Sequence, residues 1–335
     1  MEYRRLGKTG LKVSSLCLGM MTFGSKFYNI GKLDLEAAKS FLKIATESGV
    51  NFFDTADVYS FGESEEILGR AIKEVSFPRA QAVIATKVMS PMSEAAGKKT
   101  GDINNRGLSR KHIFEACEAS LRRLGIDYID LYQVHGWDWT TPMEETLRAL
   151  DDLVRVGKVR YLGASNWTAR HLAKSLQIAE YPFVSLQAYY SLAGRDLEHE
   201  LLPLCAEEGL GILPWSPLAG GLLSGKYRKG DAGRRSNFDF PPVEPACGDA
   251  ALDVLETLAN EKGATMAQLA NAWLLYQPAV SSVIIGASRE DQLRDNLKAA
   301  EIKFTPEELA RLGAATAPKK LYPSWMLDFQ NAVRN

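Results

Sequence analysis

The chain has 335 residues, 46% of them hydrophobic, and a formal net charge of -1 at pH 7. This length is enough for one large barrel or for two smaller domains, with an ample core in either case. A nearly neutral chain lacks the basic surface that a polyanion would need, so nucleic acid is not expected as a partner.

The N-terminal segment predicts a β-hairpin. Residues 3–6 and 11–13 are separated by Gly7-Lys8-Thr9-Gly10, a glycine turn that joins two short strands. Such a hairpin could plug one end of a barrel. The first twenty residues lack the features of a signal peptide, and no later stretch is long and apolar enough to span a bilayer.

From residue 16 onward, short apolar runs alternate with amphipathic segments, which is typical of parallel strands joined by helices. The predicted strands end near Gly19, Asp54, Lys87, His135, Ser165, Tyr189, Trp215 and Gly286. Helices are predicted between them, among them 35–48, 64–73, 109–125, 142–157, 169–179, 201–208, 249–262, 265–277 and 289–300. Capping boxes are predicted at Thr141, Thr265 and Thr305.

One long segment has no clear helical or strand period. Residues 217–247 are rich in Gly, Pro, Arg and Asp, and a segment this long is usually a functional lid or a mobile loop. The tail beyond Pro318 carries several aromatic residues. Eight βα units in this length indicate one (β/α)8 barrel domain over residues 1–335, an α/β TIM barrel with extra C-terminal helices.

Three polar residues stand at or near the ends of neighbouring predicted strands. Lys87 shares a strand face with Val83 and Ala85, so its ammonium is buried and needs a partner. Asp54 is the nearest carboxylate on the adjacent strand. A neighbouring ammonium stabilises a phenolate and lowers its pKa, so Tyr59 beside Lys87 could donate a proton.

The stretch FDTADVY at 53–59 resembles the signature of aldo-keto reductases, and the order Asp54, Tyr59, Lys87, His135 matches the catalytic tetrad of that family. The similarity, closest to the long-loop bacterial-type branch, extends through DYIDLYQVH, GKVRYLGASN, PWSPLAGGLLSGKY and IIGASREDQLRDN. It implies NADPH-dependent, reversible reduction of a small-molecule aldehyde or ketone. Tyr59 would be the general acid and His135 would orient the substrate oxygen.

The same resemblance implies the residues of an NADPH site, with NADPH preferred over NADH. A phosphate at a helix N-terminus beside a guanidinium is physically sensible, and Arg289 would supply that cation. The implied cofactor-binding residues are Gly19, Met20, Asp54, Ser165, Asn166, Gln187, Trp215, Ser216, Leu218, Gly220, Leu223, Lys226, Gly286, Ser288, Arg289, Gln292 and Asn296.

The chain departs from the family pattern at two positions. Gly136 stands where many relatives carry arginine, and Gly286 stands where much of the family has lysine, which leaves Arg289 as the main cation. A small residue at 136 favours a roomy apolar pocket, suited to a bulky ketone, a terpenoid or a xenobiotic carbonyl. The expected substrate pocket contains Phe23, Tyr28, Gly136 and Trp137.

Other polar residues have simpler interpretations. We expect His112, His171 and His199 to be solvated on helices, and the pair Arg234-Arg235 to be a solvated charge run. The four cysteines, Cys17, Cys117, Cys205 and Cys247, have neither paired nor metal-ligand spacing, so a soluble cytoplasmic protein without a metal or membrane attachment is expected.

Two alternatives to a reductase remain open. The chain could be a cofactor-binding regulatory subunit with slow turnover, as are channel-associated members of the resembled family. Lys87 could instead form a Schiff base in an aldolase-like barrel. Oligomeric state is also open, and a homo-oligomer is possible, because no heptad or long apolar stripe indicates an interface.

Overall fold

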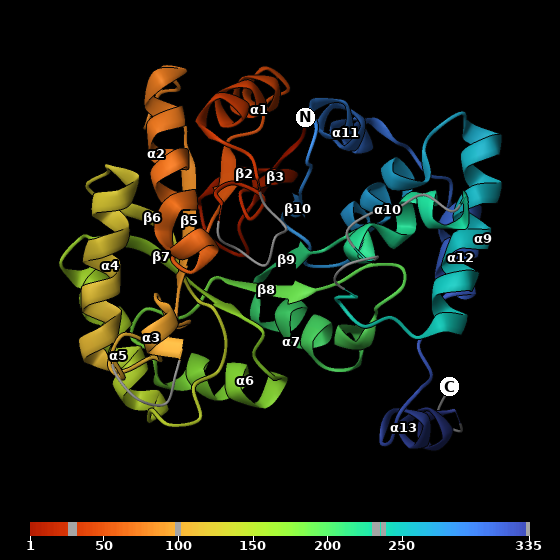
Figure 1. The fold of residues 1–335 in the computed structure, drawn as a ribbon. Coiled ribbons are helices and arrows are strands. Elements are labelled where there is room, and N and C mark those ends of the chain that lie inside the picture. The colour runs from red at the N-terminus through yellow and green to blue at the C-terminus, as the bar shows by residue number, and fades with distance from the viewer. Residues whose placement is uncertain (26–31, 98–101, 230–234, 236–238, 333–335) are drawn as a thin grey trace.

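In the computed structural model, which describes residues 1–25, 32–97, 102–229, 235 and 239–332, eight parallel strands form a nearly closed barrel (Figure 1). From β3 to β9 each strand pairs with the next along the chain, and β10 pairs with β3. A parallel bridge between Ile212 and Val280 joins the two remaining edges. The strands are β3 (Leu16–Gly19), β4 (Phe52–Asp54), β5 (Val83–Val88), β6 (Ile129–Val134), β7 (Val159–Ser165), β8 (Ser185–Tyr189), β9 (Gly211–Trp215) and β10 (Val283–Ile285). The predicted (β/α)8 barrel is confirmed.

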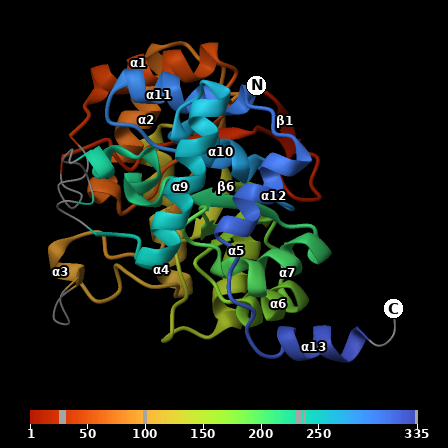
Figure 2. The same ribbon diagram turned by 90° about the vertical axis from the view of Figure 1, so that its right-hand side faces the viewer.

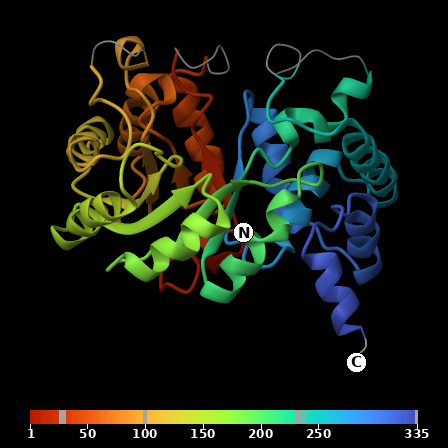
Figure 3. The ribbon, with the colours of Figure 1, turned by 90° about the horizontal axis from the view of Figure 1, so that it is seen from below.

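Helices surround the strands, and the last one, α13, projects away from the body in all three views (Figures 1, 2 and 3). The α-helices are α1 (Leu35–Glu47), α2 (Glu63–Glu74), α3 (Glu94–Gly97), α4 (Arg110–Leu124), α5 (Met143–Arg155), α6 (Ala169–Ile178), α7 (Leu201–Glu208), α9 (Pro245–Lys262), α10 (Met266–Leu275), α11 (Glu290–Leu297), α12 (Pro306–Ala315) and α13 (Ser324–Asn331). Within the described residues, no helix has both the length and the apolar character needed to cross a membrane.

The N-terminal hairpin closes one end of the barrel, as predicted. Its strands β1 (Tyr3–Arg5) and β2 (Lys12–Ser14) pair antiparallel. Leu6 and Val13 are fully buried and pack with residues inside the barrel, among them Phe52 and Leu131. The hairpin therefore covers the N-terminal ends of the strands and leaves the opposite end for a site.

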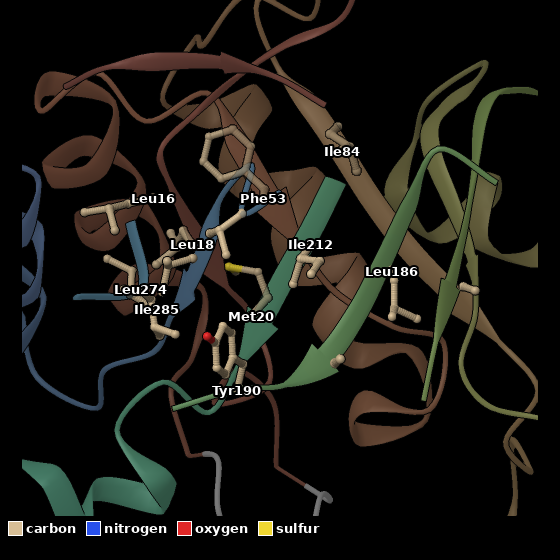
Figure 4. Packing of buried hydrophobic residues seen from close by; sticks show 14 of the residues in the cluster. Leu16, Leu18, Met20, Phe53, Ile84, Leu186, Tyr190, Ile212, Leu274 and Ile285 are labelled. Atoms are coloured by element: carbon tan, nitrogen blue, oxygen red, sulfur yellow. The ribbon is translucent and has the colours of Figure 1, made fainter. Parts of the chain in front are cut away.

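Both faces of the strands are buried, and the side chains on the two faces belong to different hydrophobic clusters. Val83 and Ala85 on β5 join the inner cluster, whereas Ile84 joins the larger cluster between strands and helices. Figure 4 shows this outer packing, where Leu18, Phe53 and Ile84 lie among other apolar side chains. Because side chains alternate along a strand, Lys87 faces the barrel interior with Val83 and Ala85.

The capping boxes at Thr265 and Thr305 are confirmed, but the one at Thr141 is wrong. Helix α5 begins at Met143 with Pro142 as its N-cap, and no side chain caps it. The hydroxyl of Thr141 instead donates to Asp138 Oδ2 at 2.7 Å. An acceptor in the preceding loop therefore prevents Thr141 from serving as the cap.

The segment after β9 has more regular structure than its composition predicts. Two 3-10 helices, η3 (Ala219–Ser224) and η4 (Lys226–Lys229), follow the strand. Helix α9 begins at Pro245, four residues before the predicted start, because Glu244 caps it and proline fits the first turn. The described part of 217–247 is therefore largely built of short turns.

Two of the three expected solvated histidines are buried, so that expectation is wrong for them. His112 is 1% exposed at the start of α4, and His171 is 5% exposed on α6. The His171 ring stacks on Trp137, with 3.8 Å between ring centroids. Charged sequence neighbours do not show which face of a helix a histidine occupies, and here that face is the packed one.

Candidate active site

Four side chains from consecutive βα units meet at the C-terminal end of the barrel. Lys87 Nζ donates to Asp54 Oδ1 at 2.5 Å and lies 3.4 Å from Tyr59 Oη. The rings of Tyr59 and His135 pack edge to face, with centroids 5.8 Å apart. The structure thus brings together all four residues predicted to be catalytic.

The Asp54–Lys87 pair is buried: Lys87 is fully buried and Asp54 is 3% exposed. Burial alone lowers the pKa of Lys87, but the charge of Asp54 and the contact with Tyr59 outweigh it and raise the pKa above its usual value. Lys87 also donates to the carbonyl of Thr55 at 2.8 Å. The ammonium is therefore retained at neutral pH, in contact with the phenol.

The second oxygen of Asp54 is held by two amides that complete the network. Gln133 Nε2 and Gln187 Nε2 each donate to Asp54 Oδ2 at 2.9 Å. Gln187 also lies 3.2 Å from Gln133 Oε1. Gln133 was not among the predicted site residues, although a glutamine on the same face of an apolar strand as the inward-facing Leu131 was a usable signal.

His135 is neutral in this environment. Burial, followed by the charge of Lys87, lowers the pKa of His135 to about 3. Its Nδ1 is buried without a hydrogen-bond partner among the described residues. A neutral imidazole beside the phenol can hold a carbonyl oxygen without adding a second positive charge next to Lys87.

The loop that carries Tyr59 is tightly constrained. Ser60, Phe61 and Gly62 all have positive φ angles, of 52°, 54° and 94°. A Cβ at Gly62 would lie only 2.5 Å from Arg123 Cδ on α4. Only glycine adopts this conformation against the arginine at low cost, so the packing fixes the loop next to Tyr59.

The expected nicotinamide end has a partly satisfied polar lining. Asn166, with φ of 55°, donates to the carbonyl of His135 at 3.1 Å and accepts from Trp215 Nε1 at 3.1 Å. Ser165 Oγ is buried without a partner among the described residues. An orphaned hydroxyl at a strand end fits a cofactor amide that would complete its hydrogen bonding.

The expected ring-stacking residue, Trp215, already has aromatic neighbours. Its ring lies 5.2 Å from Tyr189 and stacks on Phe240 at 5.7 Å between centroids.

Met20, another residue expected to bind the cofactor, is fully buried at the end of the strand that contains Gly19. Its N–H donates to the carbonyl of Asp54 at 2.8 Å.

The expected pyrophosphate loop forms the tight turns of η3. Ser216 has a φ of 51° and its hydroxyl accepts from the N–H of Gly220 at 2.9 Å. The side chain of Leu223 is fully buried in the outer core, and Leu218 packs against the same core. Lys226 Nζ lies 5.1 Å from the Tyr227 ring centroid. Backbone groups of this loop, rather than the two leucine side chains, are the ones suited to a phosphate.

The expected adenosine end is organised around the start of α11. Arg289 is exposed and makes two hydrogen bonds of 2.9 Å to the carboxylate of Asp291. Gln292 Oε1 accepts from both the N–H and the hydroxyl of Ser288 at 3.0 Å. Asn296 donates to the carbonyl of Gly286 at 3.1 Å. Asp291 is therefore a competitor for the cation predicted to bind a phosphate.

The described residues expected in the substrate pocket each have close packing neighbours. Phe23 is fully buried and packs edge to face on Phe41, 5.5 Å away. Trp137 stacks on His171, and Gly136 lies against Met89, whose sulfur would be 3.0 Å from a Cβ. Tyr28 lies outside the described residues.

The arginine pair in the long loop has one described member. Arg234 lies outside the described residues. Arg235 has a side chain 13% exposed, donates to the carbonyls of Ala219 and Pro241, and pairs with Asp239. The expectation of a solvated charge run is therefore wrong for Arg235, which holds the loop segments together.

Comparison with known proteins agrees with this geometry. Residues 15–317 match the model of the Aldo/keto reductase family. The chain is 38% identical to versiconal hemiacetal acetate reductase of Aspergillus parasiticus, covering 96% of this chain and 99% of that protein. It is 41% identical to a probable voltage-gated potassium channel subunit beta of Arabidopsis thaliana, with coverage of 90% and 92%. It is 37% identical to aldo-keto reductase AMT2 of Alternaria alternata, with coverage of 92% and 90%.

The structure is a TIM barrel with a polar cluster at its C-terminal end, and the family match identifies the chain as an oxidoreductase. The chain belongs to the Aldo/keto reductase family.

Proposed function

We propose that the protein reduces an aldehyde or ketone to the alcohol, reversibly and with NADPH, and that Tyr59 is the proton donor. The observation that carries this proposal is the placement of Lys87 Nζ between Asp54 Oδ1, at 2.5 Å, and Tyr59 Oη, at 3.4 Å. A charged ammonium held in a buried site acts on the phenol at close range, where solvent does not screen it.

In this mechanism the Tyr59 hydroxyl gives its proton to the carbonyl oxygen as negative charge develops there. Lys87 stabilises the phenolate that remains, and so makes a weak acid effective near neutral pH. Asp54 keeps the ammonium charged and in position. Gln133 and Gln187 hold the carboxylate of Asp54 so that it faces Lys87.

His135 acts as a neutral group in this scheme. Its lowered pKa keeps the ring uncharged over the physiological range. One ring nitrogen can donate a hydrogen bond to the carbonyl oxygen and orient it towards the Tyr59 hydroxyl. Donors placed in advance near a developing oxyanion supply much of the stabilisation in such reactions.

A nicotinamide cofactor, when bound, supplies the hydride to the carbonyl carbon. Ser165 and Asn166 would hold its amide, Trp215 would pack on its ring, and the turn from Ser216 to Gly220 would hold its phosphates. The preference for NADPH rests on Arg289 and Ser288 at the start of α11, where the N-terminal backbone amides favour an anion.

A second candidate is a cofactor-binding regulatory subunit with slow turnover. Its support is the relative named as a potassium channel subunit beta, which is 41% identical. The Schiff-base alternative has less support, because Lys87 is held as an ammonium by Asp54 and a protonated amine is not a nucleophile.

A panel of aldehydes, sugars and bulky cyclic ketones, assayed by NADPH absorbance in both directions, tests the proposal. We expect at least one carbonyl to be reduced with multiple turnovers, more efficiently with NADPH than with NADH. Single-turnover oxidation of bound NADPH that stays negligible with every carbonyl would favour the regulatory subunit instead. A lysine adduct trapped by borohydride without nicotinamide would favour the aldolase-like reaction.

A further inference from the structure

The start of helix α11 carries the cation proposed to bind the 2′-phosphate of the cofactor, and a carboxylate lies beside that cation. Arg289 is the N-cap of α11, and its side chain makes no capping hydrogen bond among the described residues. Two acidic residues, Glu290 and Asp291, occupy the first turn. The first N–H groups of a helix have no partner within the helix, and they favour an anion. A phosphate and the carboxylates of the chain itself therefore compete for this helix start.

Asp291 binds the Arg289 guanidinium through both of its carboxylate oxygens. Nε donates to Oδ1 and Nη2 donates to Oδ2, each at 2.9 Å. Arginine binds a phosphate through the same kind of paired hydrogen bonds. The hydrogen bond from Arg289 lowers the pKa of Asp291, and the N–H groups of Gln292 and of Asp291 itself lower it further. The carboxylate is therefore charged at neutral pH and uses the groups that a phosphate needs.

A 2′-phosphate that reaches Arg289 meets this carboxylate. A phosphate monoester carries a charge of about -1.5 to -2 at pH 7, so it must displace Asp291 from the guanidinium or bind next to a like charge. Either outcome weakens phosphate binding. The side chains of Arg289 and Asp291 are 63% and 68% exposed, and an exposed ion pair is weak enough for a ligand to break. A cofactor with a 2′-hydroxyl has no charge at that position and is free of both effects.

We propose that Asp291 is a specificity-determining residue that narrows the preference for NADPH over NADH, because it holds Arg289 in an ion pair and repels the 2′-phosphate. The inference rests on the proposed function, since it takes Arg289 as the cation of the cofactor site. It adds a residue that opposes the phosphate to the residues that favour it. The protein therefore binds both cofactors, with a smaller difference in affinity than Arg289 alone would give.

Glu290 provides the matched comparison for Asp291. It is the neighbouring carboxylate in the same first turn and is likewise exposed. Its Oε1 accepts a hydrogen bond from Ser40 Oγ on α1 at 2.5 Å, whereas the ion pair of Arg289 is with Asp291. Neutralising Glu290 therefore changes the charge at the helix start by the same amount but leaves Arg289 paired.

Isothermal titration of the full chain with NADP+ and with NAD+, without a carbonyl substrate, measures the preference directly. We expect Asp291→Asn to tighten NADP+ binding by about five- to tenfold, because it releases Arg289 and removes the like charge. The affinity for NAD+ should stay within about twofold of the wild-type value. Glu290→Gln should leave both affinities within about twofold. Both changes are exposed and nearly isosteric, so the variants should fold, which thermal melts check.

Arg289→Ala shows whether Asp291 acts through the guanidinium. Alone, this change should weaken NADP+ binding by at least about tenfold and hardly alter NAD+ binding. In the Arg289→Ala background, Asp291→Asn should improve NADP+ binding by about twofold or less, since no cation remains to be released. This non-additivity distinguishes release of the cation from a general change in surface charge.

Unchanged NADP+ affinity of Asp291→Asn would overturn the inference, and so would an equal gain from Glu290→Gln or an equal gain for NAD+. If Arg289→Ala does not weaken NADP+ binding, Arg289 is not the cation for the phosphate and the inference fails with that assignment. A wild-type protein that binds neither cofactor contradicts the proposed function as well. If the wild type binds NADP+ and Arg289→Ala weakens that binding, but Asp291→Asn does not tighten it, only this inference fails.

Discussion

At the scale of single residues, the site depends on one buried charge pair. Lys87 is fully buried and gains its stability as an ammonium from Asp54, which is in turn held by Gln133 and Gln187. Removing one member of a buried pair leaves the other uncompensated, which is usually costlier than removing both. The contribution of the Asp54–Lys87 pair can therefore be measured from the free energies of unfolding of variants.

We expect Asp54→Asn to destabilise the protein by roughly 3 kcal/mol at pH 7, because it leaves the Lys87 ammonium buried without a counter-ion. The double variant Asp54→Asn with Lys87→Met should recover part of that loss. Urea unfolding of the wild type, both single variants and the double variant measures the coupling energy. Losses that simply add would show that the two charges do not stabilise one another.

At the scale of elements, glycines show which helix contacts are tight. Gly69 lies within α2, and a Cβ there would be 2.1 Å from the backbone oxygen of Leu124 on α4. Gly313 lies within α12, and a Cβ there would meet nothing within 4 Å. The first contact sets how closely α2, which follows the Tyr59 loop, approaches α4.

This contrast gives opposite expectations for one chemical change. Gly313→Ala should stabilise the protein by about 0.5–1 kcal/mol, since alanine is the better helix former. Gly69→Ala should destabilise it by roughly 1–3 kcal/mol, since the helices must move apart. Thermal and urea unfolding of the two variants gives both values. Stabilisation by Gly69→Ala would mean that α2 and α4 are not in contact there.

At the scale of the whole molecule, the barrel was predictable because every strand leaves a local signal. All eight strand ends follow from apolar runs, and caps such as Asp34 and Ser109 locate helix starts. What could not be predicted depends on tertiary contacts. Helix α13 was missed, because no core buries its aromatic residues, and Gln133 was missed although its strand position was a usable signal.

Tertiary contacts also determine how the fold responds to pH. His112 is buried, both its ring nitrogens lack partners among the described residues, and burial lowers its pKa. The unfolded chain therefore binds a proton at His112 more readily than the folded one does. The stability associated with neutral His112 is present above pH 6.5 and is lost as the pH falls below it.

When the pH is lowered from 7 to 5, we expect the free energy of unfolding of the wild type to fall by up to about 2 kcal/mol relative to that of His112→Phe. Buried Asp57 has a raised pKa and acts in the opposite sense, but its contribution cancels in this difference. Urea unfolding of both proteins at the two pH values makes the comparison. A difference independent of pH would show that His112 titrates normally in the fold.

The central claim is that Tyr59, activated by Lys87, is the proton donor of a carbonyl reduction. Its most direct test is single-turnover oxidation of enzyme-bound NADPH by a carbonyl from the panel, followed by stopped flow for the wild type and Tyr59→Phe. We predict that the variant slows this step by at least about 100-fold, the contribution of a general acid, while NADPH affinity stays within a few-fold. Oxidation by the variant at a rate close to that of the wild type would contradict the claim.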